Sequence, residues 1–109
     1  MNNHESVEKN IDLMQLSVMV RNSSRTKDLQ KCFSCVIDAM SKYPHSPQPH
    51  NLIGVLLEKE GNHAQAMKHF RAAWALDPTF IPARWNLENF GTFYSSGKFA
   101  LDEEDCVAS

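Results

Sequence analysis

The chain has 109 residues, a length that suits one small domain. Its 42% hydrophobic and 22% charged residues are ordinary for a soluble globular protein. Lys and Arg number 11 against 13 Asp and Glu, a net charge of -2, so no basic excess favours nucleic acid as a partner.

The N-terminal residues are polar and lack the basic start and apolar core of a signal peptide. The apolar run at 11–20 is interrupted by Asp12, Gln15 and Ser17 and is too short to cross a bilayer. We therefore expect a cytoplasmic protein with no membrane partner.

Two helices are expected before the first proline-rich linker. The first is predicted over about 7–20 by apolar residues that fit one helical face, namely Val7, Ile11, Met14, Val18 and Met19. A polar turn at 21–26 leads to a second predicted helix, 27–42, which ends at Tyr43-Pro44. The linker Ser46-Pro47-Gln48-Pro49 then places a proline near the start of the next helix.

The most regular stretch is 49–78, which predicts two amphipathic helices joined by a tight turn at 60–62. Their apolar faces are Leu52, Ile53, Leu56 and Leu57 in the first helix, and Ala66, Phe70, Ala73 and Trp74 in the second. Gly54 interrupts the first stripe, where Ala would favour the helix by about 1 kcal/mol. We therefore expect a close helix contact at Gly54, with the small Ala66 as its partner.

The C-terminal part of the chain is less regular. A helix is predicted over about 81–94, and Ser95-Ser96-Gly97 ends it. Residues 98–101 are too short for a partner helix, and we expect the acidic block at 102–105 to be solvated.

A spacing of 34 residues relates these elements to one another. It pairs Cys32 with Ala66, Val36 with Phe70, Ala39 with Ala73, Pro44 with Pro78, and Met19 with Ile53 and Leu87. In the best-matched repeat, the pattern W-x2-L-G-x2-Y, A-x3-F-x2-A and a final P is met by Ile53, Gly54, Leu57, Ala66, Phe70, Ala73 and Pro78. The chain thus resembles the tetratricopeptide repeat (TPR) family.

This resemblance implies an all-α fold, in which antiparallel helical hairpins stack as a short right-handed TPR-type solenoid of about 2.5 repeats. Three positions depart from the pattern: His50 replaces an aromatic residue, and Val20 and Glu88 replace the packing glycine. The expected units are an N-terminal extension (1–12), a degenerate repeat (13–46), a well-matched repeat (47–80), a partial third repeat or capping helix (81–94) and an irregular acidic tail (95–109).

The motif Cys32-Phe33-Ser34-Cys35 is the main candidate for chemistry. A redox C-x-x-C lies at a helix N-terminus, normally in a βαβ context, whereas this one lies inside a predicted helix. Because Cys32 is in register with Ala66, we interpret it as a small buried residue, and a redox or metal site is the weaker alternative. The sequence offers no second ligand pair for zinc and no G-x-S-x-G, so we expect neither a catalytic site nor a cofactor.

The family resemblance implies a concave groove that accepts an extended peptide or a partner helix, and hence a non-catalytic adaptor for a protein partner. Side-chain amides can bond both sides of a peptide backbone, and arginine can bind a carboxylate through two parallel bonds. The family's groove positions correspond here to Arg21, Arg25, Asn51, Val55, Glu58, Lys59, Trp85, Asn89 and Phe93.

Two other functions bear on this expectation. The alternative is a structural helical protein that forms a homodimer through an open C-terminal face, made of Phe90, Phe93, Tyr94 and Phe99. A chaperone-binding carboxylate clamp would need Lys and Asn where Ser17 and Arg21 stand, so that function is not carried over.

Overall fold

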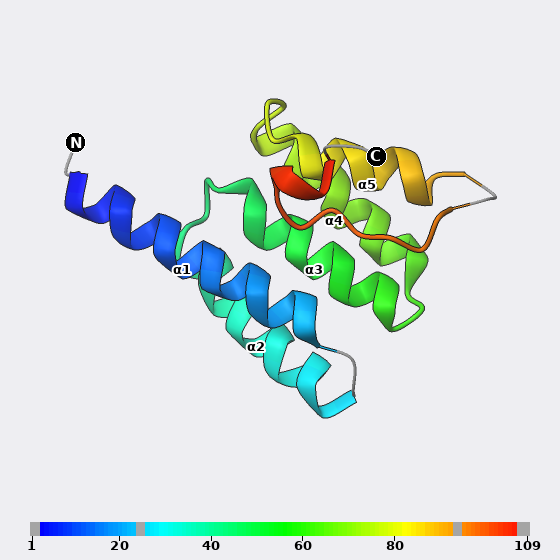
Figure 1. The fold of residues 1–109 in the computed structure, drawn as a ribbon, viewed down its shortest axis with the longest axis horizontal. Helices are drawn as coiled ribbons and strands as arrows, with labels where there is room; N and C mark the ends of the chain where they lie inside the picture. Colours follow the sequence, from blue (N-terminus) through cyan, green and yellow to red (C-terminus); the bar gives the residue numbers. More distant parts are fainter. Residues whose placement is uncertain (1–2, 24–25, 93–94, 107–109) are drawn as a thin grey trace.

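The computed structural model describes residues 3–23, 26–92 and 95–106. In these residues the chain forms five α-helices and a short 3-10 helix, and no β-strand (Figure 1). The elements are α1 (Asn3–Asn22), α2 (Thr26–Lys42), α3 (Pro47–Lys59), α4 (His63–Leu76), α5 (Ile81–Phe90) and η1 (Glu103–Cys106). The prediction of an all-helical fold is confirmed.

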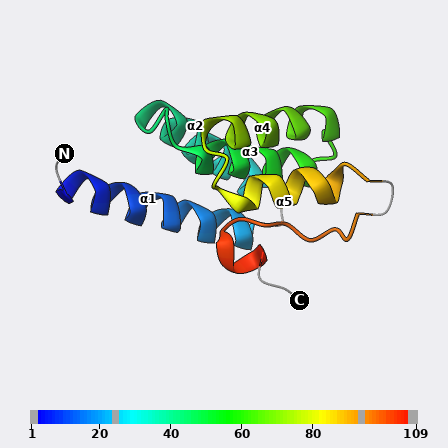
Figure 2. The ribbon, with the colours of Figure 1, turned by 90° about the horizontal axis from the view of Figure 1, so that it is seen from above.

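The helices pack as an array in chain order. Each α-helix contacts the next one, and the contact between α3 and α4 is the most extensive. In addition, α3 contacts both α1 and α5, so these three helices form one row. Figure 2 shows α2 and α4 on one side of this row and the end of the chain on the other.

The turn between α3 and α4 is a Schellman motif. The N–H of Asn62 donates to the carbonyl oxygen of Leu57 at 2.9 Å, and the N–H of Gly61 donates to that of Glu58 at 3.0 Å. Gly61 has a φ of 85°, in the left-handed region that glycine adopts without a Cβ penalty. The predicted turn at 60–62 is therefore confirmed, and this backbone geometry fixes how α4 returns along α3.

Gly54 packs against an aromatic ring rather than against the small residue that we expected. A Cβ atom at Gly54 would lie 2.4 Å from Cε1 of Phe70. Phe70 is fully buried, and its ring stacks on that of Phe90 in α5, with centroids 6.2 Å apart. The expected close contact exists, but its partner is Phe70, and Ala66 as the partner was wrong. The ring reaches across the hairpin and occupies the space that the missing side chain leaves.

Helix α1 turns a different face inward from the one that its apolar pattern suggested. Leu13, Ser17 and Val20 are buried, and Leu16 and Met19 pack on the same core. The stripe that predicted the helix is exposed on the outside, at Val7, Ile11, Met14 and Val18. Because α1 has apolar residues on two faces, periodicity locates the helix but does not identify its buried side.

Two further expectations need correction. Trp74 is 41% exposed, because Ala73 takes the inward position beside it and packs with Phe80 and Ala83. Helix α5 ends at Phe90 rather than near residue 94, and Gly91, a poor helix former, follows it. Residues 93–94 lie outside the described part of the chain.

Candidate functional site

The C-terminal segment, residues 95–106, lies across the row formed by α1, α3 and α5. In Figure 1 its orange and red trace runs from beyond α5 back between α5 and α3 to η1, and Figure 2 shows it on the side away from α2 and α4. We call the helix surface beneath it the binding face. Its polar residues are Arg21 from α1, Asn51 and Lys59 from α3, and Asn86 and Asn89 from α5.

Two fully buried asparagines, Asn51 and Asn86, hold the backbone of Ala100, and we call this pair the amide clamp. The Ala100 carbonyl accepts from Nδ2 of Asn51 at 2.9 Å and from Nδ2 of Asn86 at 2.8 Å. The Ala100 N–H donates to Oδ1 of Asn86 at 2.9 Å. Asn86 Nδ2 also donates to Asn51 Oδ1 at 2.9 Å, so each amide orients the other. The clamp therefore recognises backbone rather than side chain.

Apolar contacts flank the amide clamp on both sides. Ala100 and Leu101 are buried, and Leu101 belongs to the core cluster that contains Val20 and Val55. The half-buried Phe99 stacks on Phe90 with ring centroids 5.1 Å apart. The ammonium group of Lys59 lies 5.8 Å from the Phe99 ring centroid, within cation–π range. Three consecutive side chains of the segment thus have defined environments.

The acidic block pairs with Arg21 instead of being merely solvated, which corrects the expectation for residues 102–105. Arg21 binds both carboxylate oxygens of Asp105, with Nη1–Oδ1 and Nη2–Oδ2 distances of 2.9 Å. Its Nη2 also donates to Oδ2 of Asp102 at 3.1 Å. This two-pronged geometry is the strong form of an arginine–carboxylate contact.

The Asp105 carboxylate also organises the segment itself. Its Oδ2 accepts from the backbone N–H of Leu101 at 2.8 Å and from that of Asp102 at 3.2 Å. Burial acts to raise the pKa of Asp105, but the hydrogen bonds from Arg21 and from these two N–H groups outweigh it, so the pKa is lowered. Asp105 is therefore an ionised anchor at neutral pH.

Asn89 and Lys59 complete the binding face. Asn89 donates to the carbonyl of Lys98 at 3.1 Å and accepts from the N–H of Ser96 at 3.1 Å. Lys59 donates to the carbonyls of Val20 and Ser23 at 2.9 Å each, at the C-terminal end of α1. Burial lowers the pKa of Lys59. Lys59 thus ties α3 to α1 beneath the segment.

The remaining residues predicted for the site lie in different parts of the structure. Val55 is buried in the core, and Glu58 pairs with His63 at the start of α4. Trp85 is half-buried and lines a hollow of about 340 Å³ together with Arg21, Lys59, Lys98, Phe99, Leu101 and Asp105. Trp85 therefore lies beside the segment rather than standing exposed. Arg25 and Phe93 lie outside the described residues.

Asn86 was missed as a binding residue, although its side chain bonds both the N–H and the carbonyl of Ala100. It is fully buried on α5 and also bonds to Asn51 on α3. Asn51 and Asn86 are 35 residues apart, one residue off the 34-residue register, so they are not equivalent positions of the repeat. The periodicity therefore gave no signal for this buried pair.

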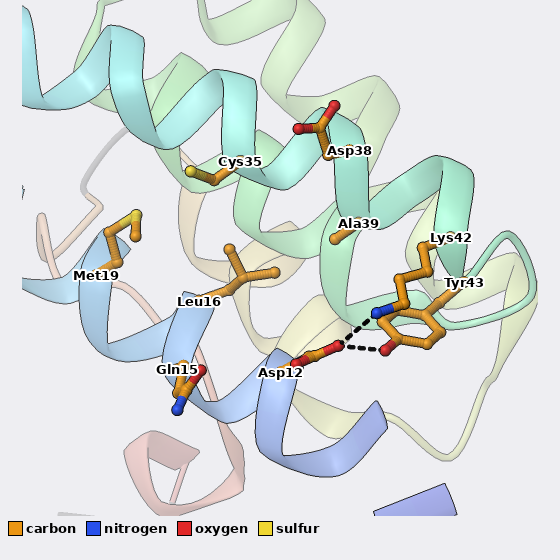
Figure 3. A pocket seen from close by; sticks show the side chains of 9 residues that line it. All are labelled: Asp12, Gln15, Leu16, Met19, Cys35, Asp38, Ala39, Lys42 and Tyr43. Atoms are coloured by element: carbon orange, nitrogen blue, oxygen red, sulfur yellow. Dashed lines mark hydrogen bonds and ion pairs between the residues drawn. The ribbon is translucent and has the colours of Figure 1, made fainter. Parts of the chain in front are cut away.

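A second hollow, of about 260 Å³, lies between α1 and α2 (Figure 3). Its polar end is Asp12, whose carboxylate accepts from Lys42 Nζ at 3.1 Å and from the Tyr43 hydroxyl. The hydrogen bonds from Tyr43 and Lys42 lower the pKa of Asp12. These groups satisfy one another, and Leu16, Met19 and Ala39 supply an apolar wall. We interpret this arrangement as a tie between the two helices.

Cys32 occupies a buried position on α2, as its register with Ala66 predicted. Its thiol donates to the Met19 carbonyl at 3.7 Å, and burial raises its pKa, the opposite of what activates a nucleophilic cysteine. Cys35 is half-buried, and both thiols are free. Within residues 3–23, 26–92 and 95–106, no three His, Cys, Asp or Glu side chains come together as metal ligands would.

Comparisons with protein-family models, with curated protein sequences and with solved structures give no match for this chain. Among the described helices, none combines the length and the apolar content needed to cross a bilayer. The class that the fold defines is thus a small all-helical array, with its own C-terminal segment held across one row of helices.

Proposed function

We propose that this chain is a non-catalytic protein–protein interaction module that holds an extended peptide across α1, α3 and α5. The observation that carries the proposal is the amide clamp, which binds both the N–H and the carbonyl of Ala100 at distances of 2.8 to 2.9 Å. A site that reads backbone accepts an extended peptide from any source whose side chains fit beside it.

We further propose a TPR-type arrangement for the helices. The 34-residue register supports it, because its paired positions on α2 and α4 are all buried: Cys32 with Ala66, Val36 with Phe70, and Ala39 with Ala73. The contacts of α3 with α1 and α5 are those that the first helices of successive repeats would make. Three free cysteines fit a reducing compartment, so we place the protein in the cytoplasm.

Selection from a displayed library of short random peptides tests the proposal. Binders should shift the side-chain NH2 signals of Asn51, Asn86 and Asn89 in ¹H–¹⁵N spectra of the full chain, because these amides contact the peptide. Arg21→Ala should weaken the acidic binders, whereas Arg71→Ala, an exposed change on α4, should not. Failure to select any binder, or shifts confined to α2 and α4, would rule the proposal out.

A second candidate function is self-association. The structure favours a surface of α1 for it rather than the C-terminal face. Of the C-terminal face considered above, Phe90 is buried, and Phe99 belongs to the segment and is half-buried against Phe90. The exposed apolar stripe lies instead on α1, at Val7, Ile11, Met14 and Val18, with the 4-3-4 spacing of a coiled-coil seam. Beside this stripe Asn10 and Gln15 are uncharged, and Glu8 pairs with Lys42 of α2.

The mass of the protein in solution tests this candidate. A homodimer through α1 should appear as a concentration-dependent mass in sedimentation equilibrium. The double variant Ile11→Lys with Met14→Lys should abolish the dimer without unfolding α1, because both side chains are exposed. A monomer at all concentrations removes this candidate and leaves the peptide-binding proposal intact.

A further inference from the structure

We propose that the binding face selects an acidic linear segment with the order aromatic, Ala, aliphatic, Asp, x, x, Asp, and that a partner protein carrying such a segment binds by displacing residues 99–105. The proposal rests on the proposed function and specifies its ligand. In this structure the position is held by the chain's own Phe99-Ala100-Leu101-Asp102-Glu103-Glu104-Asp105.

The position of Ala100 in the segment accepts only a small residue. Ala100 has no exposed surface, and both of its backbone polar groups are bonded to the amide clamp. A larger side chain would have to separate the segment from Asn51 and Asn86, and three buried hydrogen bonds would be lost. Gly would leave the site unfilled.

The positions on either side select by shape. The residue before Ala100 stacks on Phe90 at 5.1 Å and lies 5.8 Å from the Lys59 ammonium, which favours an aromatic ring. The residue after it is 4% exposed inside the cluster that contains Val20 and Val55, which favours an aliphatic side chain.

The two aspartates select by charge and spacing. Arg21 binds Asp102 and Asp105 together, and Asp105 reaches back to the N–H groups of Leu101 and Asp102. This arrangement requires the short turn of η1, with Asp102 just before it and Asp105 within it. Glu103 and Glu104, between them, are exposed.

The ion pairs of Arg21 with the segment are the contacts that a partner's segment can displace first. The side chain of Arg21 is 43% exposed and that of Asp102 is 47% exposed, so water and salt weaken the pairing. A tethered segment competes at an effective concentration of about millimolar. The affinity of a partner is then reduced by the fraction of molecules in which the segment is bound.

Binding of a labelled peptide to the full chain tests the proposal. The probe is GKFALDEED, residues 97–105 with an N-terminal fluorophore, followed by anisotropy. Asp102→Asn with Asp105→Asn weakens only the tethered copy, because the probe and Arg21 keep their pairing. We expect this double variant to bind the probe about tenfold more tightly than the parent chain.

Three matched controls accompany this measurement. Glu103→Gln with Glu104→Gln removes the same charge from the same turn and should bind like the parent. Arg21→Ala also frees the tethered segment but removes the probe's charged contact, so it should bind more weakly than the aspartate double variant. A probe in which Leu replaces the alanine that corresponds to Ala100 should bind none of the variants.

Several results would overturn the proposal. One is equal probe affinity for the parent and for the aspartate double variant, and another is the same gain in the glutamate control. A concentration-dependent dimer of the parent that the aspartate variant loses would assign the face to a second copy's segment instead. If library-selected peptides bind but the probe does not compete with them, this inference fails while the peptide-binding function stands.

Discussion

Gly54 is the residue at which one added carbon atom disturbs the packing most directly. Its Cβ would lie 2.4 Å from Phe70, whose buried ring is stacked on Phe90 and cannot move aside freely. Although Ala favours a helix over Gly by about 1 kcal/mol, we expect Gly54→Ala to lower the free energy of unfolding by about 1–3 kcal/mol through overpacking. Urea denaturation measures this change.

The control for Gly54 combines two substitutions. In a Phe70→Leu background the ring is gone, so adding Gly54→Ala should cost nothing further or should stabilise the helix. An unchanged denaturation midpoint for Gly54→Ala alone would show that α3 and α4 are farther apart than described.

Trp85 and Trp74 form a matched pair for testing the binding face. Trp85 lines the hollow beside Phe99 and Asp105, whereas Trp74 is exposed on α4. We expect Trp85→Ala to weaken peptide binding by about 2 kcal/mol or more while lowering the free energy of unfolding by less. Trp74→Ala should leave binding unchanged. If binding by Trp85→Ala falls only in proportion to its folded fraction, Trp85 serves packing alone.

Individual residues could be predicted where the family pattern and simple chemistry agreed. Arg21, Asn51 and Asn89 were predicted to share one groove from the family resemblance, and in the structure all three bond to the C-terminal segment. Asn86 was not, because an asparagine at a buried repeat position has no visible partner until the chain end folds over it. Hydrogen-bond partners so distant in sequence leave no local signal.

At the scale of helices, α3 and α4 also meet through His50 and His69. The two rings stack with centroids 5.4 Å apart, and their Nδ1 atoms are 3.2 Å apart, so one neutral ring donates to the other. Burial lowers the pKa of both histidines, and the His50 charge lowers that of His69 further. The unfolded chain therefore binds protons more readily than the folded one. The pair's contribution to stability is present above about pH 6.5 and is lost as the pH falls through the lowered pKa values.

This linkage predicts how stability changes with pH. The free energy of unfolding should fall between about pH 7 and about pH 5, and His69→Phe should flatten that dependence because no second imidazole remains to be protonated. His45→Gln, an exposed change in the linker, is the control and should keep the slope. A parent chain with constant stability across this range would contradict the described contact.

Helix positions could be read from the sequence more reliably than helix faces. Each predicted helix exists, since apolar periodicity, proline and glycine mark its position. The buried face of α1 and the inward residue near the end of α4 were misassigned, because both helices carry apolar residues on more than one side. Only the neighbouring helix decides which stripe is covered.

At the scale of the whole molecule, the course of the C-terminal segment could not be predicted. It has no periodicity, and its hydrogen bonds to the helices join residues separated by 7 to 84 positions in the chain. Composition alone suggested a solvated acidic tail, whereas Arg21 and the amide clamp give it a fixed path. The segment does not supply the second helix of a third repeat, since it lies on the side of the row away from α2 and α4 (Figure 2).

Amide hydrogen exchange of Ala100 in the full chain tests the central claim most directly. Its N–H is buried and bonded to Asn86 at 2.9 Å, so we expect it to exchange as slowly as the amides of α5, and faster after Asp102→Asn with Asp105→Asn. Exchange at the rate of an unstructured peptide would contradict the account, because the segment would then not occupy the binding face.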